Sequence, residues 1–415
     1  MNGALGGIGD AFEDRNFRFY SVGAIVSWLS FFIQMVAVSW STWELTHSTA
    51  WLATVAVLDI APNVIFLPLG GVLADRHDRF LIVVVTHALA LLQALALTVL
   101  SYAGHLTITA IAVLAFCHGS IHSFSMPGLY GMLPRFVARE KLSSAIGVSA
   151  SYTQFAIFAG PALAGWIITR YGTAPAFATN VAGYAIYLAS IAFLRTPPGF
   201  RGSAPTGKTV LGDIGDGVRY IAGHHGIRSL LLLMLMGDAL SASVYQMLPA
   251  YADKVLGMGV DGMATLLAAA GLGATLSALW LAHGGGTRAT PPRILWAFLS
   301  FVGAVIALML AGSLIPAVIA MLAYGLAGEI RRTGTVSLLQ TSVDDGQRGR
   351  VMSAQFLFQR MAGGIGMVLI GSTAETDGLR RPMLIAASLA TIAWAVAFKG
   401  RHRIASAFRT QPKVP

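Results

Sequence analysis

Residues 70–79 read GGVLADRHDR, and the charged end of this segment lies between two long apolar stretches. The stretch before it, Ala50–Leu73, and the stretch after it, Phe80–Gly104, are rich in leucine, valine and alanine. A helix needs about 20 apolar residues to cross the ~30 Å hydrocarbon core of a bilayer, and both stretches are long enough. The segment therefore predicts a tight charged loop between two membrane-spanning helices.

The composition of the whole chain supports a membrane protein. Of its 415 residues, 55% are hydrophobic and only 11% are charged, whereas soluble domains carry about 25% charged residues. The formal net charge is +10. Because the basic residues lie mostly in short loops between apolar runs, they indicate membrane topology, and no nucleic-acid partner is expected. The single cysteine, Cys117, excludes an intramolecular disulfide.

Twelve apolar runs are predicted to form membrane-spanning helices. They cover residues 19–43, 50–74, 80–103, 106–126, 143–169, 173–194, 228–252, 262–283, 293–313, 315–337, 349–374 and 381–398. The fold class expected is an all-α membrane protein with twelve transmembrane helices in two pseudo-symmetric halves of six.

The longest break between apolar runs separates the two predicted halves. The N-terminal half is residues 1–194, a cytoplasmic linker is residues 195–227, and the C-terminal half is residues 228–415. Within the linker, Asp213–His224 has apolar residues on one stripe and predicts a short amphipathic helix. Two six-span halves are a known plan for transporters.

The distribution of basic residues predicts the orientation. Of the 28 lysines and arginines, one, Arg360, lies within a span, and 23 lie on or near the side of the termini. The other four lie in the opposite loops: Arg170, Lys254, Arg380 and Arg381. Because basic loops stay in the cytoplasm, both termini are expected to be cytoplasmic, in a multi-pass protein of the inner membrane.

The loop at 70–79 resembles the cytoplasmic signature of the major facilitator superfamily, and its Asp-Arg-x-Asp-Arg form is similar to an exporter branch that includes enterobactin exporters and drug:proton antiporters. The matching residues are Gly71, Leu73, Ala74, Asp75, Arg76 and Arg79, whereas Asp78 stands at a usual glycine. The resemblance implies a twelve-helix fold with a conformational latch of Gly71, Asp75, Arg76 and Arg79. Asp75 is expected to accept hydrogen bonds from the start of the eleventh helix, near Gln347–Arg350, where unpaired amides favour an anion. The alternative is that these are ordinary cytoplasmic charges.

A second pattern in the fifth span resembles the antiporter motif of the same superfamily. Its positions are occupied by Gly147, Ala156, Gly160, Pro161, Ala164 and Gly165, with alanine at two of the usual glycines. Pro161 has no amide to donate, so a kink is expected there. In the superfamily this motif accompanies export. The alternative is that the small residues serve only helix packing.

Polar side chains inside spans suggest function, because a charge at mid-bilayer costs roughly 2.5–3.5 kcal/mol on insertion scales. The candidates for a proton-coupling site or substrate cavity are Gln34, Asp59, His118, His122, Asp238, Glu329 and Arg360. The resemblance implies that spans one, four, seven and ten line a central cavity, and all but Asp59 and Arg360 fall on those spans.

Each candidate also has a structural interpretation. Asp59 precedes Pro62 and can bind backbone amides freed there, and Glu329 can form an ion pair with Arg332 near the cytoplasmic end of its span. Arg360 needs a counter-charge, for which Glu329 and Asp238 are the candidates. The two histidines, four residues apart, can be hydrogen-bonded structural groups; no third ligand is evident nearby, so no metal is expected. Met126-Pro127-Gly128 predicts a helix end.

These observations predict a secondary transporter, a proton-coupled exporter of small amphipathic molecules such as a siderophore, drug or metabolite, working by alternating access. No phosphate-binding loop is present, so no nucleotide, and no other cofactor, is expected to drive it. The expected partners are the substrate, protons and the bilayer, and the expected state is a monomer. Uptake by proton or sodium symport on the same fold is the main alternative. A membrane-embedded enzyme and a non-transporting sensor are more distant ones.

Overall fold

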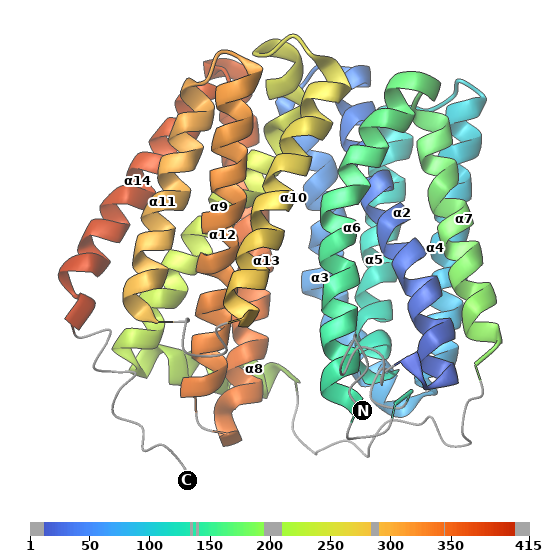
Figure 1. Cartoon of the computed structure of the whole chain (residues 1–415), viewed down its shortest axis with the longest axis horizontal. Helices are drawn as coiled ribbons and strands as arrows, with labels where there is room; N and C mark the ends of the chain where they lie inside the picture. Colours follow the sequence, from blue (N-terminus) through green and yellow to red (C-terminus); the bar gives the residue numbers. More distant parts are fainter. Residues whose placement is uncertain are drawn as a thin grey trace. The chain divides into compact units, whose positions relative to one another are not determined.

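The computed structural model describes residues 12–132, 136–137, 141–194, 210–283, 290–343 and 345–402. Helices make up nearly all of these ranges (Figure 1). Twelve of the thirteen helices have 20 residues or more, and each overlaps one of the twelve ranges expected from the sequence. The all-α fold class is therefore confirmed.

The long helices of the first half are α2 (Arg15–Thr46), α3 (Thr49–Arg76), α4 (Arg79–Tyr102), α5 (Ile108–Met132), α6 (Leu142–Tyr171) and α7 (Thr173–Ala192). The short helix α8 (Val210–Gly223) precedes the long helices of the second half. These are α9 (His225–Lys254), α10 (Gly259–His283), α11 (Pro291–Leu310), α12 (Leu314–Ser342), α13 (Asp345–Asp377) and α14 (Arg380–Lys399).

Nine of these helices are long and apolar enough to cross a membrane: α2, α3, α4, α5, α9, α10, α11, α12 and α14. The protein is therefore a multi-pass membrane protein. Helices α6, α7 and α13 have a similar length but carry more small and polar residues. The number of spans, twelve, stays a prediction.

Residue contacts divide the described chain into two compact units. The first holds the described residues of Met1–His47 and Leu58–Thr206, and the second holds those of Ser48–Val57 and Gly207–Pro415. Helix α3 is thus shared, because its first two turns pack with the second unit. The boundaries expected for the linker, residues 195–227, stay a prediction, since residues 195–209 lie outside the described part.

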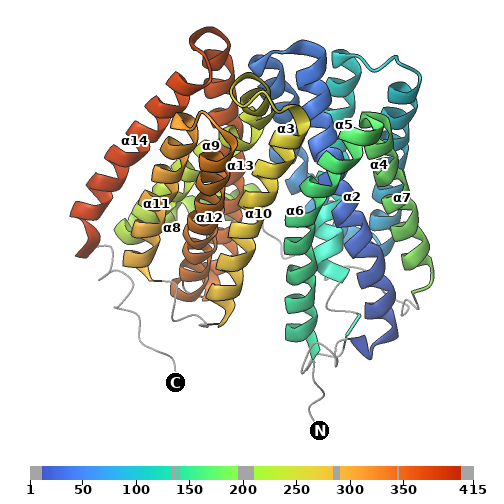
Figure 2. The same ribbon diagram turned by 45° about the horizontal axis from the view of Figure 1, so that its top comes forward.

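Within the first unit, α2 packs against α6 and α7, and α4 packs against α5 and α7. Figures 1 and 2 show these helices running lengthwise beside one another. Their shared core is built from aromatic and aliphatic side chains such as Phe17, Tyr20, Tyr187 and Ile191. This packing holds in place α2, which carries Gln34, and α5, which carries His118 and His122.

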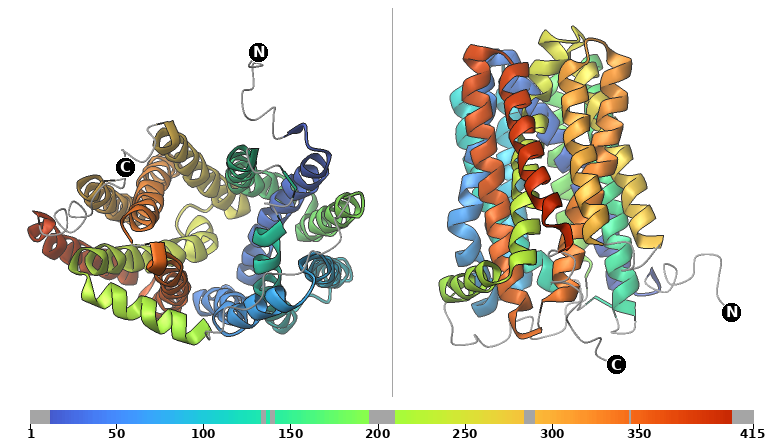
Figure 3. Two further views of the ribbon diagram at one scale, coloured as in Figure 1. Left: turned by 90° about the horizontal axis from the view of Figure 1, so that it is seen from below. Right: turned by 90° about the vertical axis from the view of Figure 1, so that its left-hand side faces the viewer.

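Within the second unit, α9 packs against α13, α10 packs against α12, and α11 packs against α12 and α14. Figure 3 shows the amphipathic helix α8 lying across the ends of the long helices. Ile221 of α8 is buried in a cluster with Ile227 and Leu339. Asp216 forms an ion pair with Arg350 of α13 at 3.6 Å. A helix was expected at 213–224, and α8 is present there. Its contacts include the buried side chain of Ile221 and the ion pair of Asp216.

Each unit contains the same kind of close helix contact at a glycine, which supports the pseudo-symmetry expected from the sequence. In the first unit, a Cβ added at Gly119 of α5 would lie 1.9 Å from the Asp59 carbonyl oxygen of α3. In the second unit, a Cβ added at Gly325 of α12 would lie 2.0 Å from the Ala270 carbonyl oxygen of α10. Glycine is required at both places because the two backbones touch. The fourth and second long helices of each unit are joined in the same way.

One helix end expected from the sequence is wrong. Met126-Pro127-Gly128 was expected to end a helix, but α5 continues through Pro127 to Met132. A proline removes one backbone hydrogen bond, and a membrane helix tolerates it when neighbouring helices support it. Gly128 packs here against Val83 of α4, and a Cβ added to it would lie 2.9 Å from that side chain. Tight helix packing therefore outweighs the local signal.

The charged loop between α3 and α4 is described only in part. The side chains of Gly71, Asp75 and Arg76 lie outside the described residues, so the latch stays a prediction. Asp78 is described, and its carboxylate accepts a hydrogen bond from the backbone N–H of Phe80 at 2.8 Å. Asp78 is the N-cap of α4, which gives a local reason for its presence at a position where the superfamily has glycine.

We expect Gly119→Ala to destabilise the protein by about 1–3 kcal/mol, because the added methyl group collides with backbone and not with a movable side chain. The loss should appear as a lower apparent melting temperature of the purified protein in detergent. Gly147→Ala is the control, because nothing lies within 4 Å of a Cβ added there. Equal melting temperatures for the two variants would contradict the close α3–α5 contact.

Candidate functional site

The first candidate site joins a carboxylate and an imidazole from two helices. Nδ1 of His118 on α5 lies 2.6 Å from Oδ1 of Asp59 on α3. The side chain of His118 is 13% exposed and that of Asp59 is 40% exposed. The contact between Gly119 and the Asp59 backbone brings these helices close enough for the bond to form. The pair is therefore held by a rigid crossing and is still reachable at the carboxylate.

Aromatic packing orients the imidazoles of this site. The ring centre of Phe31 on α2 lies 5.6 Å from that of His118 and 6.1 Å from that of His122. The two imidazole centres are themselves 6.1 Å apart. When the Asp59 carboxylate is ionised it can only accept, so Nδ1 of His118 carries the hydrogen of the shared bond. The second ring nitrogen, Nε2, is then the atom that can take or release a proton.

The alternative in which Asp59 binds backbone freed by Pro62 stays a prediction. The side chain that turns back to the backbone is Asn63, whose Nδ2 donates to the Asp59 carbonyl oxygen at 3.2 Å. Asn63 therefore supports α3 beside the proline, while the Asp59 carboxylate accepts from His118.

Among the described residues no group of three histidine, cysteine or carboxylate side chains has the arrangement of a metal site.

Gln34 lies apart from this pair. Its Nε2 donates to Oε1 of Gln93 on α4 at 3.3 Å, and Nε2 of Gln93 donates to the Leu114 carbonyl oxygen of α5 at 3.3 Å. Gln34 is 4% exposed and Gln93 is 6% exposed. The arrangement is a buried amide chain joining three helices of the first unit. It indicates a packing role for Gln34, which was grouped with the cavity residues on the sequence.

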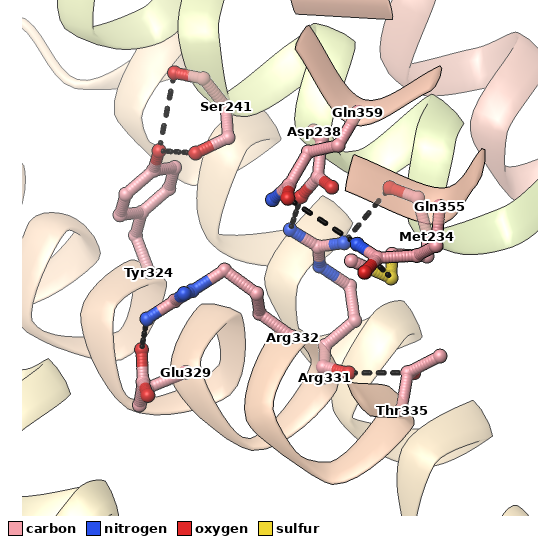
Figure 4. Close-up of polar contacts among 10 residues, drawn as sticks. All are labelled: Met234, Asp238, Ser241, Tyr324, Glu329, Arg331, Arg332, Thr335, Gln355 and Gln359. Atoms are coloured by element: carbon pink, nitrogen blue, oxygen red, sulfur yellow. Dashed lines mark hydrogen bonds and ion pairs between the residues drawn. The ribbon is translucent and has the colours of Figure 1, made fainter. Parts of the chain in front are cut away.

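The second candidate site is a polar cluster within the second unit (Figure 4). Nη2 of Arg331 on α12 lies 2.8 Å from Oδ1 of Asp238 on α9, and the side chains are only 2% and 7% exposed. Nη1 of Arg331 donates to the Met234 carbonyl oxygen at 3.0 Å. The guanidinium also lies 4.9 Å from the ring centre of Phe301. A Cβ added at Gly237 would lie 2.7 Å from its central carbon. The arginine is thus enclosed on several sides.

A second ion pair lies one turn away in the same cluster. Nη2 of Arg332 lies 2.8 Å from Oε2 of Glu329, and the side chains are 45% and 9% exposed. Thr333 donates to the other Glu329 oxygen. Figure 4 shows the two arginines leaving α12 in different directions, one toward Asp238 and the other toward Glu329. The cluster therefore contains two carboxylates and two guanidinium groups.

Hydroxyl groups extend the cluster along α9 and α12. The Tyr324 hydroxyl lies 2.5 Å from Oγ of Ser241 and donates to the Ser241 carbonyl oxygen at 3.3 Å. The ring centre of Tyr324 lies 5.7 Å from that of Tyr245 in an edge-to-face arrangement. These phenols give the cluster an aromatic wall as well as charges.

Sequence reasoning misplaced Glu329 and missed Arg331. Glu329 and Arg332 were expected near the cytoplasmic end of their span, but α12 runs from Leu314 to Ser342, so both lie close to its middle. Arg331 was counted among the cytoplasmic charges, although two adjacent arginines in the middle of an apolar run are the signal that would have identified it. The ion pair expected between Glu329 and Arg332 is present, but it lies near the middle of α12 and not near its end.

The remaining candidates are not brought together with either pair by the contacts described. Arg360 of α13 lies over Phe356, with 5.2 Å between the guanidinium carbon and the ring centre. The two carboxylates proposed as its partners, Asp238 and Glu329, form ion pairs with Arg331 and Arg332, and the pairing of Arg360 with either of them stays a prediction.

The antiporter-motif residues lie along α6, which is continuous through Pro161. Gly160 packs against α2, and a Cβ added to it would lie 2.5 Å from the Cβ of Phe32. Gly165 is buried and Gly147 is exposed. Gly160 thus has a packing role, whereas the kink expected at Pro161 stays a prediction.

Comparison with protein families gives one match that covers almost the whole chain. Residues 10–413 match the family model described as "Transmembrane secretion effector". The chain belongs to this family. The resemblance to the major facilitator superfamily expected from the loop at 70–79 is thereby confirmed.

Two efflux proteins are similar in sequence to this chain. Macrolide efflux protein A of Streptococcus pyogenes is 25% identical over 190 residues, which cover 45% of this chain and 47% of that protein. The chain thus spans about half the length of that relative. Enterobactin exporter EntS of Escherichia coli O1:K1 / APEC is 25% identical over 362 residues, which cover 86% of this chain and 84% of that protein.

Solved structures of transporters share the fold. A bacterial homolog of the human lysosomal transporter Spinster has a TM-score of 0.73 at 15% identity, covering 96% of this chain and 98% of its own. The nucleoside transporter NupG has a TM-score of 0.71 at 15% identity, covering 94% and 99%. At such identities the likeness shows the fold alone. It agrees with a transporter architecture for this member of the secretion effector family.

We expect Arg331→Met to destabilise the protein by about 3–5 kcal/mol, because it leaves the Asp238 carboxylate buried without its cation. The double variant Asp238→Leu with Arg331→Met should recover most of the loss, since it removes both charges together. Chemical unfolding of the purified protein in detergent measures both effects.

The control for this pair is Arg381→Met. The ion pair of Arg381 with Asp377 has side chains that are 71% and 44% exposed, and exposed pairs contribute about 0–1 kcal/mol. A double variant no more stable than the single Arg331 variant would mean that the buried pair has some role other than mutual neutralisation.

Proposed function

We propose that this protein is a proton-coupled exporter of small amphipathic molecules that works by alternating access. Family membership and the names of two relatives, an efflux protein and an exporter, support export in preference to uptake. The setting proposed is the bacterial inner membrane, with both termini in the cytoplasm and a monomer as the working unit. The cargo class follows the relatives, which are named for a macrolide and for enterobactin.

The observation that carries proton coupling is the bond between Asp59 and His118. Of the three carboxylates proposed from the sequence, Asp238 and Glu329 are paired with arginines. An arginine does not release its proton in proteins. Asp59 is paired with histidine, whose charge changes within the physiological range of pH. The Asp59 pair is therefore the one that can bind and release a proton in each cycle.

The proton steps follow from the atoms of the pair. With Asp59 ionised, the Nδ1 hydrogen of His118 points at Oδ1, and a proton from the outside enters at Nε2. The positive charge that then forms on the imidazole is stabilised by Asp59 and by the face of Phe31. Release to the cytoplasm restores the neutral imidazole beside the ionised carboxylate. Cargo binding alternates with the protonated state, so each proton that enters is exchanged for an exported molecule.

The latch of Gly71, Asp75, Arg76 and Arg79 completes the proposal. Its three charged residues, Asp75, Arg76 and Arg79, can pair with the start of α13 when the cytoplasmic side is closed and separate from it when that side opens. Removal of the Asp75 carboxylate is expected to slow the cycle while leaving cargo binding intact.

Proteoliposomes containing the purified protein test the proposal directly. With a pH gradient imposed across the membrane, addition of a macrolide or of a catecholate siderophore should dissipate the gradient faster than in empty liposomes. If neither cargo class affects the gradient, or if the cargo moves in the same direction as the protons, as in a symporter, the proposal is wrong.

We expect Asp59→Asn to abolish proton-coupled transport while facilitated exchange of cargo across the liposome membrane continues, because asparagine lacks the negative charge that stabilises the protonated imidazole of His118. His118→Gln should show the same separation of exchange from coupling. Asp261→Asn is the matched control, since that carboxylate is exposed in the first turn of α10. A gradient-driven rate for Asp59→Asn equal to that of the unmodified protein would remove Asp59 from the coupling site.

A further inference from the structure

Adjacent arginines of α12 have opposite environments. The side chain of Arg331 is 2% exposed, and Asp238, the Met234 carbonyl oxygen and the Phe301 ring surround its guanidinium. The side chain of Arg332 is 45% exposed, and Glu329 holds one of its terminal nitrogens. One arginine is sealed inside the unit, whereas the side chain of the other is exposed.

The position of Arg332 makes its exposure informative. It lies close to the middle of α12, a helix long and apolar enough to cross a membrane. Arginines inside a span face the interior of the bundle or a water-filled cavity, because contact with hydrocarbon is costly. A guanidinium has five N–H donors in a planar fork. After its bond to Glu329, Arg332 keeps donors that water or a bound molecule can use.

An aromatic surface accompanies this cation. The phenols of Tyr245 on α9 and Tyr324 on α12 belong to the same cluster as Arg332. Tyr245 packs edge-to-face on Tyr324, and Tyr324 is fixed by its bonds to Ser241. An apolar or aromatic body can lie on these rings while an acidic group reaches the guanidinium. The cluster thus offers the two contacts that an amphipathic acid requires.

We propose that Arg332 binds the acidic group of the transported molecule, so that the cargo class includes amphipathic organic anions. The inference rests on the proposed transport function and names the substrate class for the second unit. The cargo carboxylate binds the free edge of the guanidinium, because the planar fork of arginine matches the two oxygens of a carboxylate. Glu329 and Thr333 keep the side chain in place before cargo arrives, so little ordering is needed on binding.

Two other cations of the second unit, Arg331 and Arg381, are less suited to this role. Arg331 has no space for a ligand, since even the methyl group of an alanine at position 237 would collide with it. Arg381 is exposed but belongs to the first turn of α14, where it pairs with Asp377. Arg332 combines exposure with a position deep in a span and with neighbouring phenols.

Binding of matched acids and amides to the full chain tests the proposal. The probes are 1-naphthoate with 1-naphthamide, 4-phenylbutyrate with its amide, and salicylate with salicylamide, each titrated in an uncharged detergent free of phospholipid. A ligand that binds only the folded state raises the melting temperature, and the rise grows with the logarithm of the ligand concentration divided by its dissociation constant. We expect at least one acid to bind about tenfold or more tightly than its amide, as a charge-assisted pair requires.

Substitutions assign the preference to one residue. Arg332→Gln should remove the preference for the acid, and Arg332→Lys should retain part of it, because lysine keeps the charge but lacks the planar fork. Arg381→Gln is the control and should leave the preference unchanged. If no acid is favoured over its amide by the unmodified protein, or if Arg332→Gln binds the acid as tightly as before, the proposal is overturned.

The outcome is separable from that of the proposed function. Binding is measured without a proton gradient, so a failure of proton coupling in proteoliposomes leaves the binding result valid. Conversely, proton-coupled export of an uncharged cargo that Arg332→Gln performs at the unmodified rate, together with equal binding of acids and amides, would retain the exporter and refute the anion subsite.

Discussion

A bilayer supplies no hydrogen bonds, so each charged side chain within a span must find its partner on this chain or on what the chain carries. Asp59 meets this constraint with the imidazole of His118, and Asp238 and Glu329 meet it with the guanidinium groups of Arg331 and Arg332. The Asp59 and Asp238 pairs each join two helices, and the backbones of α3 and α5 touch beside the first of them, at Gly119. Helix packing and charge pairing are therefore two aspects of one arrangement.

The chemistry of the partner decides what each carboxylate can do. An arginine holds its proton, so the bond between Asp238 and Arg331 joins α9 and α12 without a proton to exchange. In the proposed mechanism the imidazole of His118 takes up and releases a proton, so the bond to Asp59 has two states. Residue type alone does not separate Asp59 from Asp238, because both are single aspartates in apolar runs. Their partners, which come from other helices, do separate them.

The sequence was sufficient for the long helices because twenty apolar residues leave few alternatives, and the loop at 70–79 carried the family. It was insufficient where tertiary packing outweighs local preference. Pro127 has the signature of a helix end, yet packing of Gly128 on α4 keeps α5 helical to Met132. Gln34 fell on an expected cavity helix, but the face of a helix depends on its rotation, and here that face meets Gln93 of α4. Arg331 was overlooked because charges near a span end are usually topological.

The contrast between Arg331 and Arg332 shows how one helix can serve structure and recognition together. Adjacent residues on a helix point about 100° apart, so α12 can bury one guanidinium against α9 while presenting the next to open space. Burial of the first fixes the rotation of α12, and that rotation determines where the second points. A change at Asp238 would therefore act on cargo recognition through geometry, although Asp238 itself is sealed from the cargo. In this arrangement the buried Arg331, paired with Asp238, holds α12 in the rotation that exposes Arg332.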